Sequence, residues 1–123
     1  MEPTPAHDAK ISKMTFSSVY PHYLVKVEKK GRTKEEFFQV IKWLTGYNKE
    51  QIAELSHSQV SFKEFFEKAT LNENAALITG VICGYRIENI SDPITRQVRY
   101  LDKLVDELAK GRKMEKILRN KPQ

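Results

Sequence analysis

A helix-start signal that occurs three times constrains this chain more than any other feature. Each copy has a Ser, Thr or Asn followed three residues later by Glu or Gln, just ahead of apolar sequence: Thr33 with Glu36, Asn48 with Gln51, and Ser61 with Glu64. In such a capping box, each of the two side chains bonds a backbone N–H that the first helical turn leaves without a partner. The chain is therefore expected to start helices just after residues 33, 48 and 61.

Apolar residues at three- and four-residue spacing extend this prediction to most of the chain. They predict helices over residues 18–31, 33–46, 48–55, 61–69 and 92–111, with a last helical turn over 114–118. Pro21 is expected in the first turn of its helix, where the missing N–H costs nothing. Asp92 and Pro93 form a cap with proline at the first helical position.

Residues 75–90 are open to more than one interpretation. Ala75 to Cys83 is a nearly continuous apolar run with Gly80 inside it and Gly84 after it, so it predicts either a buried helix or a buried strand. The next residues alternate apolar and polar as far as Asn89, and Ile90 breaks the alternation. A short strand and a turn are both consistent with residues 85–90.

Together these patterns predict a mainly α fold, a compact orthogonal helical bundle of about five to seven helices. A chain of 123 residues has room for one core. We expect one helical domain over residues 14–120. Residues 1–13 hold two prolines and show no apolar periodicity, which predicts a flexible N-terminal tail.

Cysteine content and hydropathy bear on the compartment. Cys83 is the only cysteine, so no internal disulfide can form, as is usual in reducing compartments. The sequence has no long apolar run and does not begin with a hydrophobic signal segment. We therefore expect a cytoplasmic protein that does not enter a membrane.

Basic residues gather in two clusters. The chain carries a net charge of +5. The clusters are Lys26, Lys29, Lys30, Arg32 and Lys34, and then Lys110, Arg112, Lys113 and Lys116. They predict an acidic partner, either a protein or a nucleic acid. The alternative is a solvated surface, because both clusters begin at helix ends, where cations are stabilised by the helix dipole.

Several blocks of the sequence resemble a known bacterial family. They are TFSSVYP (15–21), KGRTKEE (30–36), WLTGY (43–47), GVICGYR (80–86), DP (92–93) and RYLDKLVDELAKG (99–111). These blocks, spread over residues 14–119, are similar to the family called domain of unknown function 2200. The resemblance implies a bacterial origin and a shared fold, and it assigns no role to any residue.

The residues around Cys83 are the candidates for chemistry. Cys83 is either a nucleophile whose thiolate Arg86 stabilises or a small buried core residue. The histidines, His7, His22 and His57, are not placed by spacing to act as its base or as metal ligands. We therefore assign no catalytic residue, metal or cofactor.

Two functions follow as hypotheses. The favoured one is a non-enzymatic binding module that uses the basic helix ends and the surface around Tyr85 and Arg86. The alternative is a small enzyme or ligand-binding protein with a pocket lined by Thr79, Cys83, Tyr85, Arg86 and Glu88. A homodimer that buries part of the long apolar stripe over residues 92–111 is compatible with either.

Overall fold

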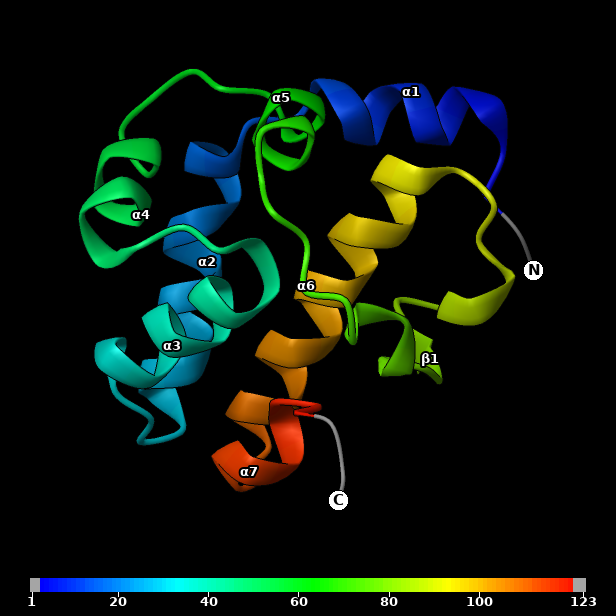
Figure 1. Ribbon diagram of the computed structural model, residues 1–123. Helices are drawn as coiled ribbons and strands as arrows, with labels where there is room; N and C mark the ends of the chain where they lie inside the picture. The colour runs from blue at the N-terminus through cyan, green and yellow to red at the C-terminus, as the bar shows by residue number, and fades with distance from the viewer. Residues whose placement is uncertain (1–2, 121–123) are drawn as a thin grey trace.

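The computed structural model describes residues 3–120 of the chain, and within that range the fold is mainly α, as predicted (Figure 1). Its α-helices are α1 (Pro5–Lys13), α2 (Phe16–Lys29), α3 (Lys34–Thr45), α4 (Lys49–Leu55), α5 (Phe62–Glu67), α6 (Pro93–Ala109) and α7 (Met114–Ile117). Two 3-10 turns, η1 (Ala75–Leu77) and η2 (Ile87–Asn89), lie on either side of the antiparallel strands β1 (Val81–Ile82) and β2 (Tyr85–Arg86).

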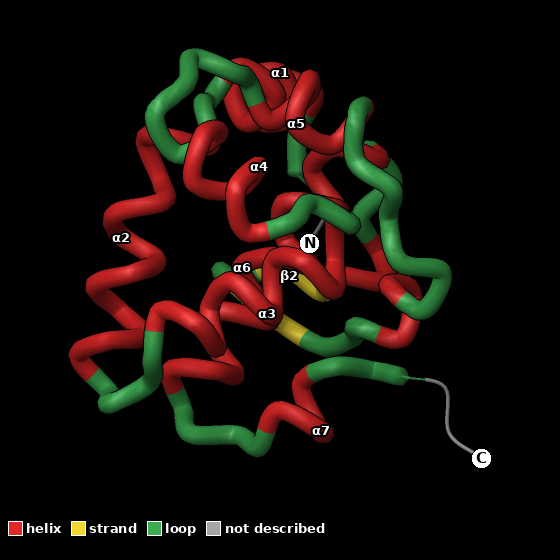
Figure 2. Tube along the Cα trace, turned by 60° about the vertical axis from the view of Figure 1, so that its left-hand side comes forward, coloured by secondary structure: helices red, strands yellow, loops and turns green. Residues whose placement is uncertain are grey.

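Helix α6 organises the molecule. It begins where expected, with the Asp92 carboxylate accepting a hydrogen bond from the Thr95 N–H at 2.9 Å and Pro93 in its first turn. Helices α1, α2, α3, α5 and α7 all pack against it, and the hairpin lies beside it (Figures 1 and 2). Its apolar stripe, including Leu101, Leu104 and Leu108, is fully buried. The remaining helices therefore complete one core around α6.

Phenylalanines fill the part of the core where α2, α3 and α5 meet. Phe16, Phe37, Phe62 and Phe65 are each at most 1 % exposed. The rings of Phe16 and Phe65 stack with centroids 4.5 Å apart, and the Tyr47 hydroxyl donates to the Phe65 carbonyl at 2.7 Å. Aromatic packing thus joins helices that are far apart in the sequence.

The local capping signals give the helix starts as predicted. At Thr33 and at Asn48 both bonds of the capping box are present. The third signal is only half formed, because the Ser61 hydroxyl accepts from the Glu64 N–H while the Glu64 carboxylate bonds the Ser61 hydroxyl rather than the backbone. Helix α5 still begins at Phe62, as expected.

The N-terminal residues differ from the prediction of a tail. Met1 and Glu2 lie outside the described residues, but Pro5–Lys13 forms α1 across the N-terminal end of α6 (Figure 1). The Thr4 hydroxyl caps this helix, Ile11 is only 5 % exposed, and the Thr95 hydroxyl donates to Asp8 at 2.6 Å. One buried apolar side chain and polar contacts from Asp8 and His7 hold the helix, and too few apolar residues are involved to give a periodic pattern.

Helix α2 also begins earlier than predicted. Thr15 caps it and Phe16 is its first residue, so Pro21 lies in the second turn rather than the first. Proline cannot donate to the Ser17 carbonyl, and the helix gives up one hydrogen bond there. The backbone before α2 is fixed instead by α5: Phe62 N–H donates to the Met14 carbonyl at 2.7 Å.

Residues 75–90 form neither a buried helix nor a buried strand. Only Ala75 and Ile78 of the apolar run are fully buried, whereas Leu77 and Val81 are 50 % exposed. Gly80 has a φ of +101°, which ends the run in a turn before a short exposed hairpin starts. The extended segment predicted as one option for residues 85–90 is present as β2, and η2 follows it.

None of the helices between residues 3 and 120 combines the length and the apolar character needed to cross a bilayer.

Candidate functional site

The fold brings the two basic clusters of the sequence together. Helices α2 and α6 pack side by side, and both end at the same side of the molecule. Asp106 of α6 pairs with Lys26 at 3.3 Å and with Lys110 at 3.0 Å. Lys26, Lys30 and Lys110 line one depression there, and the exposed Lys29, Lys113 and Lys116 are near them in the chain. We call these six lysines the basic face.

The basic face contains a depression of about 490 Å³, lined by Lys26, Lys30 and Lys110 together with Asp106, Ala109 and Gly111. Burial raises the pKa of the Asp106 carboxyl, but hydrogen bonds from Lys110 and Lys26 outweigh it, and the pKa lies below its ordinary value. Asp106 is therefore ionised at neutral pH and holds the two lysine side chains beside each other.

The arginines of the two clusters have structural roles. Arg32 donates to the carbonyls of Leu108 at 3.0 Å and Arg112 at 2.8 Å, so it closes the C-terminal end of α6. It also pairs with Glu36, and this hydrogen bond, with that from the Thr33 N–H, lowers the pKa of Glu36 to about 2. Arg112 pairs with the buried Glu107 at 3.5 Å.

The lysines differ in whether their side chains make contacts within the protein. Lys34 lies over the Phe38 ring at 5.5 Å, a cation–π contact within its own helix. Lys29, Lys30, Lys113 and Lys116 are exposed and make no ion pair within residues 3–120. These four ammonium groups are the ones available to a ligand.

The residues predicted around Cys83 lie in and beside the exposed hairpin. Cys83 and Gly84 form its two-residue turn, with φ angles of +53° and +83°. Positive φ at both positions is the mark of a type I′ turn. Glu88 accepts from the Gly80 N–H at 2.9 Å and pairs with Arg86 at 3.7 Å, and Thr79 is exposed. The hydrogen bond from Gly80 lowers the pKa of Glu88.

Cys83 is exposed rather than a core residue, and its surroundings do not activate it. Partial burial raises the pKa of the thiol, and the charge of Asp102 raises it further. Within the described residues no hydrogen bond joins Cys83 to a histidine, and His7 is engaged with Arg99 and Tyr85 instead. At neutral pH the group is a protonated thiol, which is a poor nucleophile.

Tyr85 belongs to a polar network beneath the hairpin instead of lying free on the surface. Its ring is 5.4 Å from the Arg99 guanidinium and 5.5 Å from the His7 ring. Arg99 pairs with Asp102 at 2.8 Å, and Asp102 accepts from the Tyr23 hydroxyl. Burial, followed by the nearby Asp102 charge, raises the pKa of Tyr23 well above its usual range. The network fastens α1, α2 and β2 to α6.

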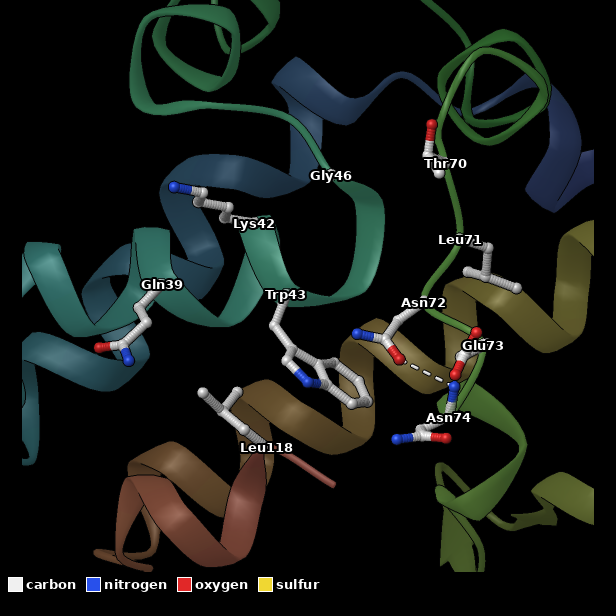
Figure 3. Close-up of a pocket in the computed structure, with 10 residues that line it drawn as sticks. All are labelled: Gln39, Lys42, Trp43, Gly46, Thr70, Leu71, Asn72, Glu73, Asn74 and Leu118. Atoms are coloured by element: carbon white, nitrogen blue, oxygen red, sulfur yellow. Dashed lines mark hydrogen bonds between the residues drawn. The ribbon is translucent and has the colours of Figure 1, made fainter. Parts of the chain in front are cut away.

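A second surface feature was not predicted from the sequence. We call it the Trp43 groove: a shallow hollow of about 740 Å³ between α3 and the segment that joins α5 to η1 (Figure 3). Its lining residues are Gln39, Lys42, Trp43, Gly46, Thr70, Leu71, Asn72, Glu73, Asn74 and Leu118. Sequence spacing gives Gln39, Lys42, Trp43 and Gly46 as one face of a helix, but nothing local shows which segment lies opposite.

Two backbone bonds and a glycine set the width of the Trp43 groove. The N–H groups of Thr70 and Asn72 donate to the last carbonyls of α3, those of Thr45 and Leu44, at 2.8 and 3.0 Å. Gly46 has a φ of +77°, and a Cβ there would lie 3.3 Å from the Thr70 side chain. Glycine therefore allows both the end of α3 and the close approach of the opposite wall.

Comparison with known proteins identifies the family. Residues 10–119 match a family described as an uncharacterized protein conserved in bacteria, DUF2200. The crystal structure of the uncharacterized protein SP1917 superposes with a TM-score of 0.82 at 42 % identity, covering 89 % of this chain and 90 % of that one. No curated protein matches the sequence. The resemblance seen in the sequence blocks is confirmed, and the chain belongs to the bacterial DUF2200 family.

Proposed function

We propose that this protein is a non-enzymatic binding module of the bacterial cytoplasm, and that its basic face holds the phosphate backbone of a nucleic acid. One observation carries the proposal: two lysine clusters about eighty residues apart in the sequence meet on one surface, with Lys26 and Lys110 on the same carboxylate. Clustered cations on one face are the electrostatic footprint of a polyanion-binding surface.

The difference between the arginines and the lysines of the basic clusters supports this proposal. Arg32 and Arg112 bond backbone carbonyls or carboxylates, so they shape the face. The lysines beside them, Lys29, Lys30, Lys113 and Lys116, present ammonium groups on flexible stems. Such groups suit a charged backbone better than a base edge, and we expect binding with little sequence preference.

The test is a fluorescence anisotropy titration of the full chain against labelled duplex and single-stranded DNA and RNA, between about 50 and 200 mM salt. The logarithm of the association constant should fall linearly with the logarithm of the salt concentration. Each lost phosphate contact should reduce the slope by about 0.7 to 0.9. Changing Lys29, Lys30, Lys113 and Lys116 to Ala should remove most of the binding.

A matched variant separates the basic face from net charge. Lys10, Lys49, Lys63 and Lys68 are also exposed, and changing these four to Ala lowers the net charge by the same amount. This control should bind nearly as well as the natural chain. Equal losses in the two quadruple variants, or no binding at the lowest salt concentration, would reject the proposal.

A further inference from the structure

The Trp43 groove presents an aromatic ring among polar side chains that have no partner. Within residues 3–120, the side chains of Gln39, Lys42, Glu73 and Asn74 make no hydrogen bond or ion pair. The Asn72 side-chain oxygen accepts from the Asn74 N–H at 2.8 Å, which leaves its amide nitrogen as a donor facing Trp43 (Figure 3). Donors and acceptors therefore surround the ring.

The ring itself is held in one orientation. The Trp43 indole N–H donates to the Asn120 side chain at 2.9 Å, and Leu118 packs at the lower end of the groove. Figure 3 shows the indole pointing from α3 toward the opposite wall. The ring is partly buried and packs against the core on one side. A fixed indole that lines a groove is a stacking surface for another flat ring, and its orientation costs little to maintain on binding.

We propose that the Trp43 groove takes one unpaired nucleotide of a single RNA strand whose backbone lies on the basic face. This inference rests on the proposed function and narrows it to single-stranded RNA. The base would stack on Trp43, and the Asn72 and Asn74 amides would bond its edge. Glu73 would accept from the ribose 2′-hydroxyl, and Lys42 would meet a phosphate.

Helix α7 links the two surfaces along the chain. Lys113 and Lys116 belong to the basic face, and Leu118, two residues beyond Lys116, lines the groove. The proposal therefore has the strand pass from the basic face to the groove along α7. An apolar peptide could also hydrogen-bond the same amides, but it carries no negative charge for Lys113 and Lys116 to bind.

The single tryptophan makes the groove directly observable. The full chain is titrated with unlabelled eight-nucleotide oligouridylate and oligoadenylate, and with an RNA duplex, while tryptophan fluorescence is recorded. Single strands should quench the emission saturably, and the duplex should bind through the basic face without quenching. Trp43→Ala should weaken single-strand binding about tenfold in the anisotropy assay, since stacking on one aromatic side chain is worth that much.

Two further variants distinguish the loss of a groove contact from a general loss of folding. Asn74→Ala removes a groove amide and should weaken single-strand binding severalfold, whereas Asn89→Ala, an exposed residue of η2, should not. Duplex binding should be the same in all three variants. If single strands bind with the expected salt dependence but leave the fluorescence and the Trp43→Ala affinity unchanged, the groove proposal fails and the proposed function stands.

If no nucleic acid binds at low salt, both proposals fail together. If uridine or adenosine monophosphate quenches Trp43 as strongly as an oligonucleotide, the site belongs to a free nucleotide and the single-strand proposal is overturned. Quenching by an apolar peptide alone would overturn it as well.

Discussion

Cys83 holds a backbone conformation that its side chain does not favour. Its φ of +53° is the left-handed region, where Asn and Gly are the usual residues of a type I′ turn. Cys83→Asn should therefore raise the free energy of unfolding by about 0.5 kcal/mol. Urea denaturation measures the change, with Cys83→Ser as a control that removes the thiol and keeps the backbone preference. A loss of stability in Cys83→Asn would contradict this account of the turn.

The same thiol should react slowly although it is exposed. Burial and Asp102 raise its pKa, so at any pH below the folded value a smaller fraction of the thiol is ionised in the folded chain than in the unfolded chain. We expect reaction with an aromatic disulfide reagent at about pH 8 to be slower for the folded protein than for the urea-unfolded chain. The difference should vanish at a pH above both values. A faster folded thiol would restore the nucleophile hypothesis.

Glu36 couples a helix cap to the acid stability of the protein. Its folded pKa of about 2 is below the unfolded value, so ionised Glu36 stabilises the fold above that unfolded value. The contribution is lost as the pH falls toward 2. Glu36→Gln keeps the shape of the capping box and loses the charge, which should cost about 1 kcal/mol at pH 7. Chemical denaturation of both proteins at several pH values should show the difference shrinking below about pH 4.5.

At the scale of elements, α1 tests whether the first residues belong to the core. Ile11 is the buried residue of that helix, and Ile11→Ala should cost about 2 kcal/mol because it leaves a cavity between α1, α5 and α6. Lys13→Ala, an exposed change in the same helix, should cost almost nothing. Thermal or urea unfolding distinguishes the two variants, and equal stabilities would mean that α1 does not dock.

The elements that sequence reasoning predicted are those whose signals are local. Thr33 and Asn48 bond donors within their own first turn, so the residues that encode those helix starts are neighbours in the chain. Helix α1 was missed because Ile11 and Asp8 depend on partners in other helices, and Asp8 meets Thr95 across most of the sequence. The apolar run at 75–83 misled because composition indicates burial, whereas the turn at Gly80 decides which residues are buried.

The candidate sites divide in the same way. Both lysine clusters are visible in the sequence. That Lys26 and Lys110 pair with the same Asp106 depends on the packing of α2 against α6. One wall of the Trp43 groove is made by residues 70–74, and this segment is bonded to Leu44 and Thr45, which are about 25 residues away in the sequence. The Cys83 region shows the converse: the residues are adjacent in sequence, and most of their bonds serve the hairpin.

At the scale of the whole molecule, the basic face gathers like charges, but most of its lysines lie at helix C-termini, where the helix dipole favours cations. Lys30→Glu relieves the repulsion and also places a negative charge at the C-terminal end of α2, so the two effects should largely cancel in stability, to within about 0.5 kcal/mol, while polyanion binding weakens. Lys68→Glu makes the same change in charge near the end of α5 and should affect binding far less. Urea unfolding and anisotropy titrations on the same preparations give both quantities. A Lys30→Glu variant with normal affinity would remove Lys30 from the interface.

The central position of α6 affects when the protein can fold during its synthesis. The helix occupies residues 93–109, so a ribosome completes it after α1 to α5 have already been made. Until then, the apolar faces of α1, α2, α3 and α5 lack the stripe of Leu101, Leu104 and Leu108 against which they pack. The core around Phe16, Phe37 and Phe65 can therefore close only after α6 has left the exit tunnel, so these residues should fold as one unit rather than helix by helix during synthesis.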